Sequence, residues 1–489
     1  MKRNQIPATL FLLFLTIFSS SAYVYASHAY YQIGFPLDDA WIHQTYARNL
    51  AWLGEWAFLP GKPSAGSTAP LWSSLLAVGY WFRLNPYLFT YLLGGLALFG
   101  VALIGGRIFA GYFPGRSKQS MWVSVFLVLE WHLVWAAASG METLLMAFLI
   151  LWVMLEVVRP SPRSLILGIL IGLSMWVRPD GITLLGPAAI AVLISRRSWR
   201  ERLWGLARLC LGILACLLPY VLFNVWLDGS VWPNTFFAKQ AEYAIVRQSP
   251  LWKRLAAQTG LLLVGAGALL VPGLVVFMQQ AIRQRSWIWL TLPVWLGGYL
   301  GLYAWRLPVT YQHGRYVIPS MPVYFVCGLA GMAVWMHSSR TSMWRRVFGK
   351  TWLMSCALIL GLFWLQGAWA YARDVGVIES EMVAVARWVN ANTQKKALIA
   401  AHDIGALGYF GGRDILDLAG LVSPEVIPFI RDESRLKQFL DEQGADYLVA
   451  FPGWYPELVK FGRLEFSSQG LFSPGMGGEN MCVYAWFAP

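Results

Sequence analysis

The chain has 489 residues, of which 57% are hydrophobic and only 13% are charged, and its mean hydropathy is +0.51. A soluble protein usually carries about 25% charged residues, so this composition excludes an ordinary soluble protein and indicates a polytopic membrane protein. The formal charge of +13 does not indicate nucleic-acid binding, because the Lys and Arg residues fall in short clusters between apolar segments, as membrane orientation requires. Four of the five cysteines lie within apolar runs, so no disulfide framework is predicted.

The first apolar segment, residues 7–27, is long enough to span a membrane and follows Lys2 and Arg3. We interpret it as an uncleaved first helix, because no small-residue cleavage pattern separates it from the loop that follows. The two basic residues predict that this helix starts in the cytoplasm. The acidic pair Asp38 and Asp39 is therefore expected on the outer side of the membrane.

Residues 28–70 form the predicted first outer loop. Within it, residues 40–53 place apolar side chains at helical spacing, which predicts an amphipathic helix lying along the membrane and ending at Gly54. Asp38 can cap this helix, and Asp39 can complement its dipole. The two carboxylates can equally serve as a general base and its neighbour. The spacing alone leaves both interpretations open.

Ten further apolar segments bring the predicted number of spans to about eleven. They cover residues 86–106, 120–138, 142–158, 164–177, 182–195, 203–224, 258–280, 287–304, 316–337 and 351–370. Residues 70–82 are also apolar but short, and we expect an interfacial or re-entrant helix there, with Ser67 and Thr68 as its cap. If this segment crossed the membrane, the arginine clusters of all later loops would face outward, against the usual cytoplasmic bias.

The C-terminal region has a different pattern. Helices are predicted at residues 381–392 and 434–442, and strands at 397–401, 415–418, 447–451 and 481–487. This pattern indicates a small α/β domain, and an odd number of spans places it outside the cytoplasm. We therefore divide the chain into a transmembrane module, residues 1–371, and an extracytoplasmic domain, residues 372–489.

Five ionisable residues of the predicted outer loops lie at about the same membrane depth: Glu142, Arg178, Lys239, His313 and Arg315. Ionisable groups at this depth are energetically costly and often functional. Structural explanations exist for single members of this set. Arg178 can pair with Asp180, Lys239 can extend to lipid headgroups, and Arg315 can be an interfacial anchor. Together with the acidic pair, however, these residues suit an anionic lipid headgroup and a hydroxyl nucleophile.

The motifs of the outer loops resemble a known superfamily, the polyprenyl-phosphate-sugar-dependent glycosyltransferases of the C fold (GT-C). The resemblance rests on an ordered series: Pro36-Leu-Asp-Asp-Ala-Trp-Ile, Ser139-Gly-Met-Glu, Arg178-Pro-Asp-Gly, Pro233-Asn-Thr-Phe-Phe-Ala-Lys, Gly314-Arg-Tyr-Val-Ile-Pro and His402-Asp-Ile-Gly. The superfamily includes protein O-mannosyltransferases, lipid A aminoarabinose transferases and terminal arabinofuranosyltransferases. The last group is the most similar in pattern.

The resemblance implies an inverting sugar transfer. An outer-loop aspartate deprotonates an acceptor hydroxyl, which attacks the anomeric carbon while the carrier phosphate leaves, and Asp38 is slightly favoured over Asp39 as the base. Cations stabilise the charge on the leaving phosphate. The expected roles are donor-phosphate binding by Lys239, Arg315 and Arg178 with support from His313, and sugar or acceptor binding by Glu142, Asn234, His402 and Asp403.

The expected partners are a polyprenyl-phosphate sugar, membrane lipid, and a glycan, lipid or protein acceptor, at the cytoplasmic (inner) membrane of the cell. Some relatives involve a divalent cation near the acidic pair, although this sequence has no dense ligand cluster that requires one. Two alternatives stay open. A transporter or flippase for lipid-linked sugars predicts charges deep within the spans, where this chain has few besides Glu130. A non-catalytic relative would bind the carrier lipid without turnover.

Overall fold

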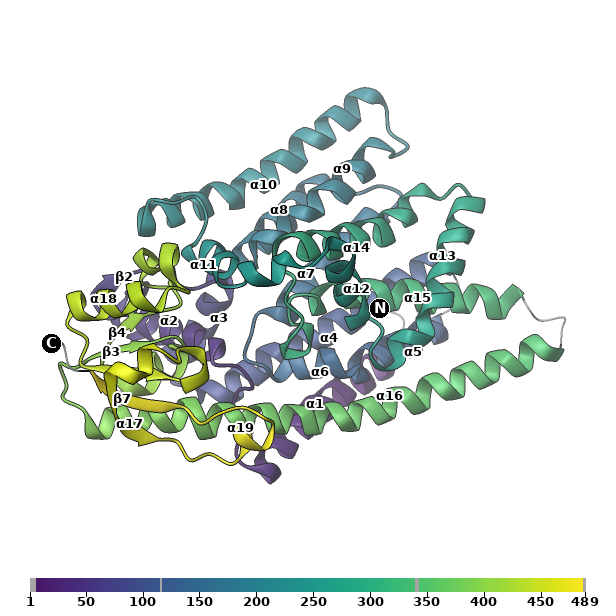
Figure 1. The fold of residues 1–489 in the computed structure, drawn as a ribbon. Coiled ribbons are helices and arrows are strands. Elements are labelled where there is room, and N and C mark those ends of the chain that lie inside the picture. Colours follow the sequence, from purple (N-terminus) through teal and green to yellow (C-terminus); the bar gives the residue numbers. More distant parts are fainter. Residues whose placement is uncertain (1–5, 115–116, 339–342, 487–489) are drawn as a thin grey trace.

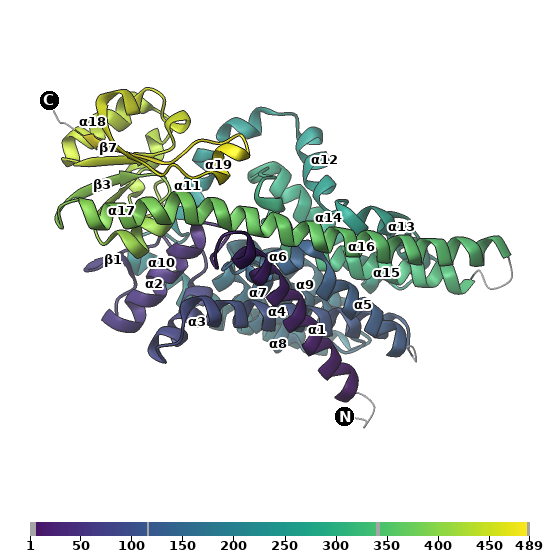
Figure 2. The ribbon, with the colours of Figure 1, turned by 90° about the horizontal axis from the view of Figure 1, so that it is seen from below.

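The structure is a computed structural model and describes residues 6–114, 117–338 and 343–486. Lys2 and Arg3, on which the orientation of the first helix depends, lie outside these ranges, as does Phe487 at the end of the last predicted strand. A bundle of helices fills most of the molecule, and a small sheet domain lies at one end of it (Figures 1 and 2).

Six helical stretches are long and apolar enough to cross a membrane within the described residues, and there are seven if one bent pair is counted. The six are α1 (Ile6–Tyr30), α4 (Pro86–Tyr112), α10 (Trp199–Asp228) and the stretches Gly265–Arg283, Gln312–His337 and Arg346–Asn392. The pair is α5 (Ser117–Leu129) and α6 (Trp131–Ala138), whose axes differ by 56°. Glu130 occupies the break, where its carboxylate accepts a hydrogen bond from the N–H of Leu133.

The predicted count of about eleven spans is larger than this number, although all the predicted segments are helical. Three of them form apolar helices shorter than 18 residues: α7 (Thr143–Val157), α8 (Ser164–Val177), and η1 with α9 (Pro179–Leu184 and Leu185–Leu193). A fourth predicted span, α14 (Trp287–Arg306), has 20 residues, but its Trp and Tyr residues lower its mean hydropathy, and it is not among the six. The segment predicted at 258–280 is divided among α12 (Leu251–Leu261), η3 (Gly265–Leu270) and α13 (Val271–Arg283). The chain is a multi-pass membrane protein.

The first outer loop contains α2 (Asp39–Leu53), β1 (Ala57–Leu59), β2 (Lys62–Pro63) and α3 (Pro70–Trp81). As predicted, α2 ends at Gly54, which has a φ of 72°. The predicted helix is present, but its polar side packs inside the protein. His43 and Gln44 are buried, and they bond to Ser73 Oγ and Thr90 Oγ1 at 2.9 and 2.8 Å. The cap predicted for α3 is also absent, since Ala69 precedes the helix.

A long helix connects the bundle to the C-terminal domain. α16 (Met343–Ile378) continues through a π-helical turn, Glu379–Val383, into α17 (Ala384–Asn392), so the predicted last span and the predicted helix at 381–392 form one rod (Figure 2). The five-stranded sheet that follows has the order β4-β3-β5-β7-β6. β3 is parallel to β4 and β5, whereas β7 is antiparallel to β5 and β6.

The strands are β3 (Leu398–Ala401), β4 (Asp414–Asp417), β5 (Tyr447–Ala450), β6 (Gly462–Ser467) and β7 (Cys482–Trp486). The sequence predicted all of them except β6, an edge strand that is mostly exposed. The remaining helices and turns are α11 (Asn234–Glu242), η2 (Ala244–Gln248), η4 (Gln312–Gly314), η5 (Ile318–Ser320), α15 (Met321–Ser338), η7 (Leu407–Gly411), η8 (Pro424–Phe429), α18 (Glu433–Gln443), η9 (Pro452–Trp454), η10 (Leu458–Phe461) and α19 (Phe472–Gly475). Among them, α11 lies where the bundle meets the sheet domain (Figure 1).

Candidate active site

Asp39 is the first residue of α2, and two cations surround its carboxylate. Its Oδ2 atom lies 2.6 Å from Arg315 Nη1 and 3.8 Å from Lys239 Nζ. Burial alone would raise the pKa of Asp39, but Arg315 and Lys239 outweigh this effect and hold the pKa well below its usual range. Asp39 is therefore ionised at neutral pH. Its side chain is 29% exposed, so a ligand can still reach it.

Asp38 has a different environment. Although it precedes α2, its side chain makes no capping bond to that helix, so the predicted role as a cap of α2 is wrong. Instead, Oδ2 accepts a hydrogen bond from the N–H of Gly405 at 2.7 Å, and Oδ1 accepts one from Ala406 at 2.8 Å. A Cβ atom at position 405 would overlap the Asp38 carbonyl, which explains the glycine there. The carboxylate thus links the first outer loop to the C-terminal domain.

Asp38 and Asp403 influence each other's titration. Burial, followed by repulsion from Asp403, raises the pKa of Asp38 to about 8, against the opposing effect of its two backbone hydrogen bonds. Burial also raises the pKa of Asp403 to about 6. Asp403 Oδ2 is buried and has no hydrogen-bond partner within the described residues. The two carboxyl groups therefore carry less than two full negative charges near neutral pH.

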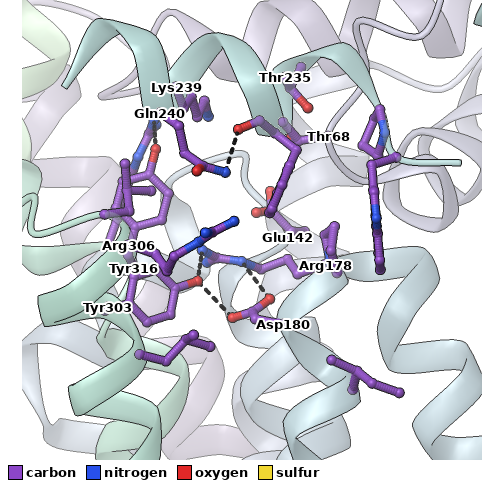
Figure 3. Close-up of a pocket in the computed structure, with 18 of the residues that line it drawn as sticks. Thr68, Glu142, Arg178, Asp180, Thr235, Lys239, Gln240, Tyr303, Arg306 and Tyr316 are labelled. Atoms are coloured by element: carbon purple, nitrogen blue, oxygen red, sulfur yellow. Dashed lines mark hydrogen bonds and ion pairs between the residues drawn. The ribbon is translucent and has the colours of Figure 1, made fainter. Parts of the chain in front are cut away.

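A cavity of about 520 Å³, which we call the cation cavity, is lined by Lys239 and Arg315, the two partners of Asp39. Figure 3 shows this cavity with Lys239, Arg178 and Arg306 labelled. Four cationic side chains line it: Arg178, Lys239, Arg306 and Arg315. Arg178 donates to the Tyr303 hydroxyl at 2.8 Å, and its Nε lies 3.5 Å from Asp180 Oδ1. The pairing of Arg178 with Asp180 considered from the sequence is therefore present, and the guanidinium still faces the cavity.

Arg306 and Arg315 retain capacity to bind an anion. Arg306 contacts the rings of Phe236 and Trp305 and has no ion pair with a carboxylate in the described parts of the chain. Arg315 donates from Nη2 to the Tyr316 hydroxyl at 2.9 Å, whereas its buried Nε has no acceptor there. Because an unsatisfied buried donor is costly, an anionic group that accepts from Arg315 would be favourable.

Two residues predicted to bind the sugar or acceptor, Glu142 and Asn234, and one predicted to support phosphate binding, His313, have different environments. Glu142 lines the cation cavity, and its Oε2 lies 3.5 Å from His43 Nε2. Asn234 is buried at the start of α11 and is not among the side chains that line the cavity. His313 is also absent from this lining, because its ring is paired with Asp374 at 2.7 Å in a different cavity. The structure therefore does not bring His313 to the predicted cation cluster.

A larger cavity of about 930 Å³ lies between the bundle and the C-terminal domain, and we call it the interdomain cavity. Asp38, Asp39, His402 and Asp403 all line it, as do Lys239 and Arg315, which it shares with the cation cavity. The structure therefore brings His402 and Asp403, which the sequence assigned to sugar or acceptor binding, into one cavity with the acidic pair.

His402 is held between two partners in this cavity. Its Nε2 lies 3.3 Å from Glu242 Oε1, and its Nδ1 lies 2.7 Å from the Tyr455 hydroxyl. Burial lowers the pKa of His402, but Glu242 more than compensates, so the pKa is raised overall. Glu242, Arg306 and Tyr316 were not predicted as site residues. Glu242 lies three residues after Lys239 on a helix that begins after Pro233. Because side chains three residues apart lie on the same face of a helix, this spacing could have identified Glu242 as a neighbour of the site.

The described arrangement does not fit a divalent cation. No group of three or more His, Cys, Asp or Glu side chains is arranged to hold a metal ion among the residues described. Asp38 is bonded by two backbone N–H groups, and Asp39 faces two cations. Both members of the expected metal-binding pair thus have other partners.

Comparison with known proteins identifies relatives of this chain. Over 227 residues it is 31% identical to the terminal beta-(1->2)-arabinofuranosyltransferase of Mycobacterium tuberculosis. This match includes 42% of the chain but only 35% of that protein. Residues 370–484 match a family described as a domain of unknown function (DUF8728).

Two solved structures are similar over nearly the whole chain. ArnT from Cupriavidus metallidurans bound to undecaprenyl phosphate has a TM-score of 0.62 at 12% identity, with 98% of both chains covered. The oligosaccharyltransferase of Archaeoglobus fulgidus with zinc and sulfate has a TM-score of 0.63 at 11% identity, covering 98% of this chain and 73% of that one. These similarities confirm the expected architecture: the chain has the GT-C fold of multi-pass membrane glycosyltransferases.

Proposed function

We propose that this chain transfers a sugar from a polyprenyl-phosphate carrier to an acceptor hydroxyl outside the cytoplasm. The observation that carries the proposal is the position of Asp39, whose cationic neighbours Arg315 and Lys239 form the wall shared by two cavities. The named activity of the mycobacterial relative and the undecaprenyl phosphate in the ArnT structure support a lipid-linked donor.

The cation cavity suits the donor phosphate. As the bond to the sugar breaks, negative charge develops on the phosphate, and preorganised cations stabilise that charge. An apolar groove of about 550 Å³ lies next to it between α9 and α14, lined by Ile190, Val294 and Trp295. Leu302 lines both the groove and the cation cavity. A polyprenyl chain in the groove would thus place its phosphate among the cations.

We assign the base to Asp39, although the resemblance slightly favoured Asp38. Asp39 is ionised and partly exposed, whereas Asp38 is 7% exposed and both of its oxygens accept backbone hydrogen bonds. When Arg315 and Lys239 share their charge with the donor phosphate, the pKa of Asp39 rises and its carboxylate becomes a better proton acceptor.

The transfer then proceeds in one displacement. Asp39 takes the proton of the acceptor hydroxyl, and the hydroxyl oxygen attacks the anomeric carbon from the side opposite the phosphate. The bond between that carbon and the phosphate oxygen breaks, and the polyprenyl phosphate leaves with the electron pair. In this proposal Glu142 binds sugar hydroxyls in the cation cavity, and His402 and Asp403 line the path of the acceptor through the interdomain cavity, whereas Asn234 is buried away from both.

We further propose that the protein lies in the cytoplasmic membrane with its C-terminal domain outside. Two arginine clusters then face the cytoplasm, as charge bias requires: Arg196, Arg197, Arg200 and Arg202 at the start of α10, and Arg283 and Arg285 at the end of α13. This orientation puts Asp39 and both cavities on the outer side, where an envelope glycan, a glycolipid or a protein can reach them.

Transfer assays on reconstituted protein test the proposal. A mixture of polyprenyl-phosphate sugars should yield a glycosylated acceptor, and Asp39→Asn should reduce the rate by about 10²–10⁴-fold. Asp414→Asn is a suitable control, because Asp414 is exposed and pairs only with Lys62 among the described residues. Full activity in Asp38→Asn, Asp39→Asn and the double variant would refute the proposal. Carrier binding without turnover in the unaltered protein would favour the non-catalytic alternative.

A further inference from the structure

A third cavity, of about 520 Å³, has no role in the transfer step described above. We call it the side cavity, and it is contiguous with the interdomain cavity, because five residues line both: Leu37, Tyr311, Gln312, Val377 and Ile378. Its volume lies within the roughly 300–1,000 Å³ that is usual for small-molecule sites. Any acceptor in the interdomain cavity therefore has additional space beside it.

The side cavity contains an ordered polar cluster, drawn from three separate parts of the chain. Asp374 of α16 accepts a hydrogen bond at Oδ2 from His313 Nε2 at 2.7 Å and another from Trp135 Nε1 at 2.9 Å. The imidazole of His313 lies edge-on to two indole rings of α6, with centroid distances of 5.3 Å to Trp131 and 5.0 Å to Trp135. A carboxylate and two indoles are thus held in fixed positions on one wall.

Two features of this cluster are energetically unfavourable. Trp131 lines the cavity and is 8% exposed, yet its Nε1 is buried and has no acceptor within the described residues. An indole N–H normally finds a partner when it is buried. Gln312 and His313 also have φ values of 54° and 56°, a region that non-glycine residues rarely adopt. Backbone strain of this kind is concentrated at binding and catalytic sites.

We infer that the side cavity binds a neutral sugar residue of the acceptor, so that the acceptor is a glycan of at least two residues. This inference rests on the proposed function, because it places the receiving hydroxyl in the interdomain cavity. The Trp131 indole at the cavity wall would pack against the C–H groups of a sugar ring and donate a hydrogen bond from Nε1, and Asp374, whose side chain is 27% exposed, would accept hydrogen bonds from the sugar hydroxyls. A carbohydrate uses both side chains, whereas an acyl chain would cover the exposed part of the carboxylate and leave the Trp131 N–H without an acceptor.

Glycan binding tests this inference without a donor sugar. The full chain in lipid nanodiscs is applied to an array of neutral oligosaccharides, the corresponding monosaccharides, and the same monosaccharides linked to an alkyl chain. The expected result is binding to an oligosaccharide that is tighter than binding to its monosaccharide. Asp374→Asn and Trp131→Phe should each weaken oligosaccharide binding about tenfold. Trp122→Phe is the matched control, because Trp122 is 73% exposed on α5.

A second type of variant controls for local misfolding of the first two. Val264→Trp places a bulky side chain at the cavity wall without removing any of the hydrogen bonds named above, and it should also weaken oligosaccharide binding. The inference fails if no oligosaccharide is retained, if the variants bind like the unaltered protein, or if the alkyl chain rather than the second sugar determines affinity. Asp39→Asn separates the two proposals, because it should slow transfer about 10²–10⁴-fold while the side cavity still binds the second sugar; full transfer activity in this variant would refute the proposed function alone.

Discussion

Replacing Asp39 with Asn should change catalysis and donor binding in opposite directions. The variant removes the proposed base, which contributes about 10²–10⁴-fold to the rate. It also removes the carboxylate that competes with the donor phosphate for Arg315 and Lys239, which lie 2.6 and 3.8 Å from its Oδ2. The rate of transfer should therefore fall while the affinity for polyprenyl phosphate rises.

The gain in affinity can be bounded from the geometry. Two opposite charges about 4 Å apart interact by about 1 kcal/mol in water and by about 4 kcal/mol in a protein surface environment. The side chain of Asp39 is 29% exposed, so we take the lower part of this range, about 1–2 kcal/mol. This energy corresponds to an affinity for polyprenyl phosphate that is about 5–30-fold higher in the variant.

Titration of reconstituted protein with polyprenyl phosphate, followed by calorimetry, measures this affinity, and a labelled donor measures the rate. Asp414→Asn should change neither quantity, since Asp414 is exposed at the surface. A parallel decrease in affinity and rate in Asp39→Asn would refute the reasoning. It would show that Asp39 holds Arg315 and Lys239 in place for the phosphate rather than competing with it.

Three further predictions concern the neighbouring groups. Gly405→Ala should lower the thermal unfolding midpoint and the transfer rate, because the added Cβ would overlap the Asp38 carbonyl. Gly475→Ala is the control and should change neither, because position 475 has open space around it. Equal unfolding midpoints in the two variants would contradict this account. Burial raises the pKa of Asp403 to about 6 and that of Asp38 to about 8. The protonated carboxyl groups therefore contribute fully to the stability of the folded state below about pH 4, and this contribution is lost as the pH rises towards 8. Asp403→Asn should reduce this decline in stability, measured by chemical denaturation at a series of pH values, and an unchanged decline would argue against it. Arg306→Met should weaken polyprenyl phosphate binding about fivefold and leave the thermal midpoint unchanged, because Arg306 has no ion pair with a carboxylate in the described chain; a loss of stability without loss of affinity would assign it a structural role.

Local patterns predicted the elements of this fold well, because apolar runs and turn residues act over short distances. The helix from Asp39 to Leu53 and four of the five strands of the C-terminal sheet were located correctly. The strand from Gly462 to Ser467 was missed, since an exposed edge strand buries too little apolar surface to produce a clear pattern. The number of membrane spans stays a prediction, because several of the predicted spans form apolar helices shorter than 18 residues.

The site was only partly predictable, because its partners are distant in the sequence. The charges that gather on Asp39 come from Lys239 and Arg315, which shared motifs and membrane depth indicated. The role of Asp38 could not be predicted, since its hydrogen-bond donors are 367 and 368 residues away. His313 was assigned to the phosphate for its charge, but the positive φ of Gln312 and His313 turns it towards Asp374, and no sequence pattern specified that turn.

The hydrogen bonds of Asp38 have a mechanical consequence. The backbone at Gly405 and Ala406 belongs to the C-terminal domain, while Asp39, the residue after Asp38, pairs with Arg315 and Lys239. Any displacement of that domain as an acceptor enters is therefore transmitted through one rigid carboxylate to the first turn of α2. Occupancy of one cavity can in this way be communicated to the other without a hinge or a moving loop between them.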